Sequence, residues 1–286
     1  MIQVMDTIKE QELRELKAQL SGYCSDKGIS KADLAVKAQV SGATLSAIEN
    51  EQWKKISVAM VKKLQSFLNA ESSGEIYETS DFVSIVQLCD TARQHRLMIG
   101  LVGDTGTGKT TSLKHYSLRQ NTYRVTFEKS MNPKQFFSYL LKELGVDSSG
   151  NINAMISKIA DELNCKQSPL VIIDETGKIT HPVLLYLHDL REKTKGNCGI
   201  VLAGMPYFRE NLKKYAQKGK EGYSEFLRRV NLWHTLSGLS VKEIHFVAQA
   251  NGITDPVELR DLSFKKRFGD LMNEICLKKI INSKLN

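Results

Sequence analysis

The sequence predicts an α/β protein, in which a parallel sheet flanked by helices follows a small all-α segment and precedes a C-terminal helical segment. Two observations carry this prediction. The apolar run 97–102 leads into a glycine-rich loop, and the apolar run 170–173 ends in two acidic residues. Helical patterns separate these runs from each other and from a third apolar run at 199–204. Strands that alternate with helices favour right-handed crossovers and a parallel sheet.

Length and composition indicate a globular protein of more than one domain. The chain has 286 residues, of which 41% are hydrophobic and 25% are charged, and this length exceeds the usual size of one domain. No uninterrupted apolar run approaches the length needed to cross a bilayer, and residues 1–15 lack the apolar centre of a signal peptide. We therefore expect a cytoplasmic protein without a membrane partner.

Charge and cysteine content give weaker indications. The formal net charge is +8, and the excess lies in residues 205–286, which hold fifteen basic and nine acidic side chains, whereas residues 1–75 hold ten of each. Such an excess suits a polyanion such as nucleic acid, but it is also typical of a solvated surface. The five cysteines form no C-x-x-C pair, so we expect buried free thiols rather than disulfides or a zinc site.

Two short helices across a turn are predicted near the N-terminus, the first capped by Ser30 and the second over residues 43–50. This run resembles the repressor-like helix-turn-helix family over about residues 8–70. In that family the second helix enters the major groove. The resemblance therefore implies DNA contacts by Ser41, Ala43, Thr44 and Ser46. A helical docking module is the alternative, because residues 1–75 carry no net positive charge.

The glycine-rich loop has the spacing of a P-loop, G-x4-G-K-T, between a predicted strand and a predicted helix. Its glycines allow successive backbone N–H groups to surround phosphates, Lys109 reaches the β- and γ-phosphates, and the Thr110 hydroxyl is left for Mg²⁺. We therefore expect ATP and Mg²⁺ as cofactors. The predicted nucleotide-binding residues are Gly103, Asp104, Thr105, Gly106, Thr107, Gly108, Lys109, Thr110 and Thr111.

A second motif supports the first. The apolar run 170–173 is followed by Asp174 and Glu175, as expected for a buried Walker B strand that delivers carboxylates to its C-terminal edge. Asp174 is predicted to hold the Mg²⁺ shell with Thr110, and Glu175 to orient or deprotonate the attacking water. Catalytic roles are thus predicted for Glu175 and Lys109.

Arg228 and Arg229 close a predicted helix before the strand-like stretch 231–236. Paired arginines are often only surface charge. Planar positive charge beside a γ-phosphoryl group, however, stabilises the transition state of phosphoryl transfer, whether it comes from the same subunit or from a neighbour. We predict that Arg228 or Arg229 has this role.

With these motifs in this order, the chain from about residue 76 resembles the AAA+ ATPases, and within them the DNA-transposition ATPases of the phage Mu B and transposon target-selector kind. The resemblance implies an ATPase that oligomerises on double-stranded DNA as a ring or filament, selects target DNA and activates a transposase. It also implies three domains, a helix-turn-helix domain at 1–74, an AAA+ ATPase core at 75–238 and a C-terminal helical lid at 239–286.

The chain departs from the AAA+ pattern at two positions. Met272 lies where the lid usually carries a sensing arginine, for which Arg267 could substitute, and Met205 follows the fourth strand where a polar residue is expected. Both losses predict a slow, switch-like ATPase. In the lid, five apolar side chains are predicted to form the packing face: Phe264, Phe268, Leu271, Met272 and Ile275.

Three other functions share parts of this pattern. A replication initiator or helicase loader would carry every motif of residues 76–286. An ATP-switched transcription regulator would use the helix-turn-helix on one operator, although such proteins usually need a further sensor region. A catalytically dead nucleotide-binding adaptor is disfavoured by the intact Lys109, Thr110, Asp174 and Glu175.

Overall fold

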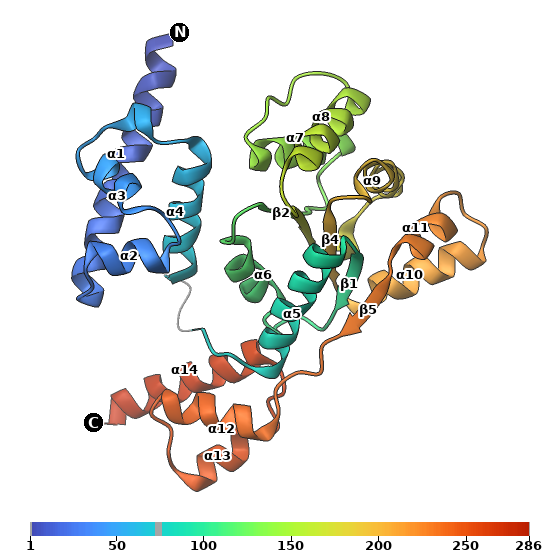
Figure 1. Cartoon of the computed structure of the whole chain (residues 1–286). Coiled ribbons are helices and arrows are strands. Elements are labelled where there is room, and N and C mark those ends of the chain that lie inside the picture. The colour runs from blue at the N-terminus through green and yellow to red at the C-terminus, as the bar shows by residue number, and fades with distance from the viewer. Residues whose placement is uncertain (1, 72–75, 286) are drawn as a thin grey trace.

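The computed structural model describes residues 2–71 and 76–285. Figure 1 shows three parts in chain order, namely N-terminal helices, a sheet with helices on both faces, and C-terminal helices. The predicted boundary between residues 74 and 75 lies outside the described residues. The predicted boundary after residue 238 falls in the loop between the last strand and the first C-terminal helix.

The N-terminal helices pack around a small apolar core. Ser30 caps the second helix through a capping box with Asp33, as the sequence predicts, and Leu34, Leu45 and Ile48 are buried together. Leu118, at the end of the helix that follows the P-loop, packs against this core. The elements are α1 (Ile2–Lys27), α2 (Lys31–Lys37), α3 (Gly42–Glu49), η1 (Trp53–Lys55) and α4 (Val58–Glu71).

The sheet has five strands in the order β2-β3-β4-β1-β5, and every neighbouring pair is parallel, as predicted. Val102 pairs with Gly204, and Thr126 pairs with Asp174, so the carboxyl ends of the four longest strands meet at one edge. This edge is where a parallel sheet presents its ligand site. The strands are β1 (Met98–Val102), β2 (Thr122–Thr126), β3 (Leu170–Asp174), β4 (Gly199–Gly204) and β5 (Leu232–Thr235).

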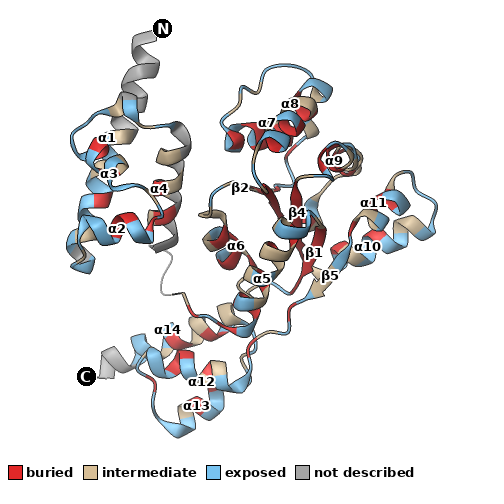
Figure 2. Cartoon of the chain, viewed as in Figure 1, coloured by how far each residue is buried: buried red, intermediate tan, exposed pale blue. Residues whose placement is uncertain are grey.

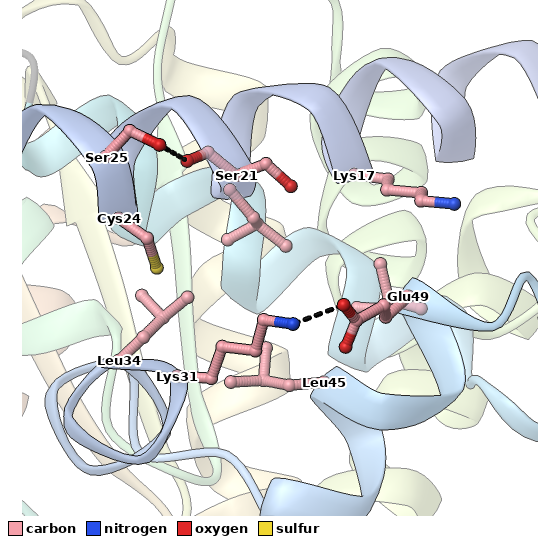
Figure 3. A pocket seen from close by; sticks show the side chains of 10 residues that line it. Lys17, Ser21, Cys24, Ser25, Lys31, Leu34, Leu45 and Glu49 are labelled. Carbon is pink, nitrogen blue, oxygen red and sulfur yellow. Dashed lines mark hydrogen bonds and ion pairs between the residues drawn. The ribbon is translucent and has the colours of Figure 1, made fainter. Parts of the chain in front are cut away.

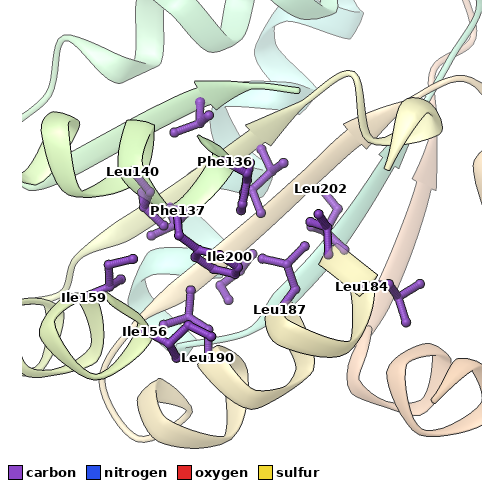
Figure 4. Packing of buried hydrophobic residues seen from close by; sticks show 14 of the residues in the cluster. Phe136, Phe137, Leu140, Ile156, Ile159, Leu184, Leu187, Leu190, Ile200 and Leu202 are labelled. Atoms are coloured by element: carbon purple, nitrogen blue, oxygen red, sulfur yellow. The ribbon is translucent and has the colours of Figure 1, made fainter. Parts of the chain in front are cut away.

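Helices cover both faces of the sheet, which explains the continuous apolar runs of its central strands. Ile200 and Leu202 of β4 pack against α7, α8 and α9 (Figure 4), whereas Val201 and Ala203 face α5 and α6. In Figure 2 the central strands are accordingly buried. The flanking elements are α5 (Ser80–His95), α6 (Lys109–Ser117), α7 (Pro133–Leu144), α8 (Ile152–Cys165), η2 (Thr176–Lys178), α9 (His181–Thr194), α10 (Pro206–Gln217) and α11 (Tyr223–Arg229).

The C-terminal helices α12 (Val241–Ala250), α13 (Pro256–Leu262) and α14 (Phe268–Leu285) form a separate apolar cluster. Leu271 and Ile275 are buried there, with Phe268 and Met272 packed beside them, as predicted. The prediction for Phe264 is wrong. This side chain is 82% exposed, because it lies in the turn before α14 rather than on the face of that helix.

Two carboxylates tie the C-terminal helices to the start of α5. Asp81 is buried and accepts hydrogen bonds from the backbone N–H groups of Ser237 (3.1 Å) and Gly238 (2.9 Å). Burial alone would raise the pKa of Glu243, but hydrogen bonds from Ser240 and Ser80 outweigh it and hold that pKa at about 2. These charge-assisted bonds fix the position from which the C-terminal helices approach the sheet.

All five cysteines are free thiols. Cys89 and Cys198 are buried as predicted, and burial raises the pKa of both to about 12. Cys165 and Cys276 are exposed, so the prediction of buried thiols is wrong for these two. Cys165 is the last residue of α8, and Cys276 lies on the solvent side of α14. Across residues 2–71 and 76–285, no helix has the length and apolar character of a membrane span.

Candidate nucleotide-binding site

The P-loop connects the end of β1 to the start of α6 at the carboxyl edge of the sheet. Gly106 (φ +81°) and Gly108 (φ +87°) adopt left-handed backbone conformations that favour glycine. Gly108 is the N-cap of α6, so the first N–H groups of that helix have no partner within the helix and are available to an anion. Gly106 and Gly108 therefore suit the geometry of an anion-binding turn.

Lys109 lies inside the loop. Its ammonium group donates hydrogen bonds to the backbone oxygens of Gly103 and Asp104, both at 2.7 Å. Burial lowers the pKa of Lys109, and the negative charges of Asp174 and Glu175 oppose this shift. The ammonium group is thus held within the loop, where it could contact a phosphate bound by the loop N–H groups.

A cavity of about 270 Å³ opens beside the loop. It brings together residues from the P-loop and the start of α6, from the turn after β3, from the end of β4 and the residue after it, and from the beginning of α14. Its lining is Thr105, Gly106, Gly108, Lys109, Thr110, Thr111, Glu175, Gly204, Met205, Phe268 and Gly269. Most of the predicted nucleotide-binding residues therefore share one cavity with the predicted catalytic carboxylate.

The C-terminal helices complete this cavity. The N–H of Gly269 donates a hydrogen bond to the Gly106 oxygen (2.8 Å), and a Cβ added to Gly269 would lie 3.2 Å from the Gly106 Cα. Only a residue without a side chain allows this close approach without displacing the loop. Sequence reasoning missed Phe268 and Gly269 as lining residues, although a glycine that opens a lid helix is a usable signal.

Asp174 ends β3 at the same edge, and Glu175 follows it. The Asp174 carboxylate is only 1% exposed, and its Oδ1 accepts a hydrogen bond from the Glu175 N–H (2.9 Å). Glu175 has a left-handed backbone (φ 60°), a costly conformation for a residue other than glycine, and such strain gathers at functional sites. Its side chain lines the cavity and forms an ion pair with Lys178 (3.1 Å).

Arg124 of β2 was missed by the sequence reasoning. Its Nη2 lies 3.0 Å from the Asp174 Oδ2 and also donates to the Thr126 hydroxyl (2.9 Å). An arginine in a short β-strand gives no motif. The signal that could have found it is geometric, because Arg124 and Thr126 share one face of β2 and Thr126 pairs with Asp174 across the sheet.

The residues present fit a magnesium ion held together with phosphates. Thr110 and Asp174 supply a hydroxyl and a carboxylate, which are the hard oxygen donors that Mg²⁺ prefers. Among the described residues no group of three or more histidine, cysteine, aspartate or glutamate side chains could hold a metal by itself. Mg²⁺ is commonly bound by one or two protein ligands, water and substrate phosphates, and this donor set suits that arrangement.

The two positions that depart from the AAA+ pattern lie at the P-loop and in the lid. The Met205 sulfur accepts a hydrogen bond from the Thr105 hydroxyl (3.3 Å) and lines the cavity. Met272 packs within the C-terminal cluster. Arg267 instead reaches the P-loop, where its Nη2 lies 3.5 Å from the Asp104 Oδ2. Arg267 therefore places a cation beside the P-loop, which Met272 does not.

Arg228 and Arg229 end α11 and are not among the described residues that line the cavity. Arg229 forms an ion pair with Glu192 of α9 (2.6 Å), whereas Arg228 is exposed. A role for one of these arginines at the nucleotide site of a neighbouring subunit therefore stays a prediction. Arg228 is the better candidate because its guanidinium is accessible.

We expect Arg228→Ala to lower ATP hydrolysis by about 1,000-fold, as for loss of an arginine supplied to a phosphoryl-transfer site. Nucleotide affinity should stay within about twofold, because the P-loop of the same chain is untouched. Steady-state hydrolysis and fluorescent-nucleotide binding measure the two effects. Arg229→Ala serves as the matched control, and a larger loss in that variant would transfer the role to Arg229.

The predicted DNA-contacting residues lie at the start of α3. Ser41 is the N-cap of this helix, and its hydroxyl contacts Thr44 at both the backbone N–H (3.1 Å) and the side chain (2.8 Å). Ser41, Ala43 and Ser46 are exposed and Thr44 is half-buried. Two helices across a turn are thus present, and part of the polarity of Ser41 and Thr44 serves the helix cap.

A second cavity of about 270 Å³ lies between α1, α2 and α3 (Figure 3). Apolar side chains of Leu20, Leu34 and Leu45 form part of its wall, and an ion pair between Lys31 and Glu49 spans the two short helices. Lys31 is therefore partly neutralised. This ion pair agrees with the lack of net positive charge in residues 1–75.

The strand order, a P-loop after β1 and an acidic pair at the end of β3 define a P-loop ATPase in which C-terminal helices contact the loop. Residues 92–212 match the family model described as "AAA domain". Residues 92–212 are thus similar to AAA domains, and the chain is an ATPase.

Comparison with curated proteins extends the likeness beyond that domain. The chain is 24% identical over 261 residues to the Mu-like prophage FluMu DNA transposition protein B of Haemophilus influenzae. This similarity covers 84% of the chain and 87% of that protein. The similarity therefore extends beyond residues 92–212 to most of the chain.

Solved structures of similar shape include the Aeropyrum pernix ORC2 protein in ADPNP–ADP complexes, with 14% identity and a TM-score of 0.47 over 62% of this chain and 53% of that one. The replication initiator DnaA bound to AMPPCP and single-stranded DNA has 13% identity and a TM-score of 0.47 over 73% and 63%. The chain thus spans less than two thirds of either structure.

Proposed function

We propose that this ATPase is an ATP-dependent DNA-binding protein that oligomerises on duplex DNA, selects target DNA and activates a transposase. The observation that carries the proposal is the similarity to a DNA transposition protein B, which extends over most of both chains. A complete phosphate-binding loop and acidic pair accompany it. ATP with Mg²⁺ is the proposed cofactor, and double-stranded DNA, further copies of the chain and a transposase are the proposed partners.

In this proposal ATP acts mainly as a switch for assembly. Residues 268 and 269 of the C-terminal helices line the same cavity as the P-loop, so a nucleotide there would contact both parts of the chain. The methionines at positions 205 and 272 replace polar groups that favour hydrolysis in similar proteins. Tight binding with slow turnover would keep an assembled form long enough to mark a DNA site.

The DNA-binding surface is proposed to lie mainly on the ATPase part. Lys213, Lys214 and Lys218 on and beside α10 are exposed, and within the described chain none of them forms a salt bridge. Lys17 and Lys31 of the N-terminal helices are both ion-paired with glutamates. Free surface cations release counterions from DNA, whereas paired ones contribute less. Many weak phosphate contacts in an oligomer would give sequence-tolerant binding.

Filter binding of the full chain to plain duplex DNA tests this assignment. The Lys213→Gln/Lys214→Gln variant should bind more weakly and should lose about two units of the slope of log affinity against log salt. The Lys17→Gln/Lys31→Gln variant removes the same charge from the N-terminal helices and should bind almost as the parent does. Equal losses of DNA affinity in the two variants would contradict the proposal. So would a DNA affinity of the parent that ATP does not raise.

Footprinting separates the proposed function from a transcription regulator. With ATP, the proposal predicts protection that lengthens with protein concentration and tolerates sequence. A single protected operator that is independent of ATP would instead support sequence-specific use of the helix-turn-helix.

A further inference from the structure

Arg124 lies beside the acidic pair but belongs to neither the P-loop nor that pair, and neither motif accounts for a buried arginine there. Its side chain is only 16% exposed, and it reaches from β2 to the Asp174 carboxylate on β3. Its Nε is buried without a hydrogen-bond partner among the described residues. A buried guanidinium with an unsatisfied donor is costly, so packing alone does not account for it.

The contact of Arg124 falls on the carboxylate proposed to serve the metal. One Asp174 oxygen accepts from the Glu175 N–H, and the other is held by Arg124. Both oxygens are therefore engaged within the protein, and the charge of the carboxylate is balanced by a cation. Removing one partner of such a buried pair leaves the other charge uncompensated.

A divalent cation near Asp174 would interact electrostatically with both the Asp174 carboxylate and the Arg124 guanidinium. The carboxylate attracts Mg²⁺ and the guanidinium repels it, and in a largely buried site neither effect is strongly screened. The pair as a whole therefore attracts Mg²⁺ less than a free carboxylate would. Phosphate oxygens supplied by a nucleotide would restore the missing negative charge.

We propose that Arg124 is a positioning residue that acts through Asp174 and weakens Mg²⁺ binding, so that the metal is held only together with nucleotide. This inference rests on nucleotide binding at the P-loop and is independent of DNA. Arg124 holds the carboxylate in a defined orientation and sets the charge that the metal encounters.

The test measures how strongly Mg²⁺ improves nucleotide binding, without any use of hydrolysis. A fluorescent ATP analogue is titrated with the full chain in EDTA and in excess Mg²⁺. By linkage, the ratio of the two Kd values is the factor by which the protein strengthens Mg²⁺ binding to the nucleotide. We expect Arg124→Gln to increase this ratio by about tenfold.

Arg119→Gln is the matched control. Arg119, just after α6, also forms an ion pair, with Asp90 of α5 at 2.6 Å. Both of these side chains are more exposed than those of Arg124 and Asp174. For Arg119→Gln the ratio of the Kd in EDTA to the Kd in excess Mg²⁺ should equal that of the parent. An unchanged or smaller ratio in Arg124→Gln would contradict the proposal, because Arg124 would then not oppose the metal.

A double variant removes the risk that a lone buried carboxylate prevents folding. Asp174→Asn alone leaves the guanidinium and should give the lowest ratio. Arg124→Gln/Asp174→Asn removes both charges and should give a ratio several-fold above that of Asp174→Asn. Equal ratios in these two variants would mean that Arg124 only supports the structure of Asp174. Failure of the parent to bind nucleotide in either buffer would contradict the ATPase site itself.

Discussion

Lys109→Ala is expected to lower nucleotide affinity by more than about 100-fold, because each lost charge-assisted hydrogen bond to phosphate contributes roughly 1.5–3 kcal/mol. The Lys109 ammonium lies within the P-loop and has no substitute among the described residues that line the cavity. Equilibrium binding of a fluorescent ATP analogue measures the effect. In the proposed function this variant should also fail to assemble on DNA.

The matched control is Lys114→Ala, on the same helix. Lys114 is exposed in the last turn of α6, so its loss removes the same charge without touching the cavity. Its nucleotide affinity should equal that of the parent, and melting temperatures of both variants show whether the fold is kept. Lys109→Ala with parental affinity would disprove the assignment of the cavity as the phosphate site.

Glu175→Gln is expected to keep ATP bound and to lower hydrolysis by about 100- to 10,000-fold, the usual contribution of a positioned base. The glutamine preserves the size of a side chain that lines the cavity, while it removes the carboxylate that would accept a proton from water. Single-turnover hydrolysis measures the chemical step. Because ATP would persist, the variant should remain on DNA as a stable assembly.

Glu175 also forms an ion pair with Lys178, so a control must separate the two effects. Lys178→Met breaks the pair and leaves the carboxylate in place. Its hydrolysis should stay within a few-fold of the parent. Normal hydrolysis by Glu175→Gln would show that the role assigned to Glu175 is wrong.

The sheet and its ligand edge were predictable because local patterns determine them. Buried parallel strands are apolar on both faces, as Ile200 to Ala203 illustrate, and the P-loop has a fixed spacing between a strand and a helix. The predicted helix cap at Ser30 is likewise a local hydrogen bond between neighbouring residues. Such features need no knowledge of distant parts of the chain.

Contacts between distant segments were not predictable in the same way. Arg124 meets Asp174 across 50 residues, and Gly269 meets Gly106 across a much longer separation. Only the register of β2 on β3 and the docking of α14 bring these residues together. The burial of Phe264 was predicted from helical spacing, but that spacing does not fix where α14 begins. The roles of Arg228 and Arg229 depend on a neighbouring subunit, which a single chain cannot supply.

Electron microscopy of the protein with a slowly hydrolysed ATP analogue and plain duplex DNA tests the central claim most directly. The proposal predicts rings or filaments on DNA of unrelated sequence, which appear with the analogue, lengthen with the DNA and are absent for Lys109→Ala. Separate single particles at fixed positions, or assemblies that form equally well without nucleotide, would contradict it.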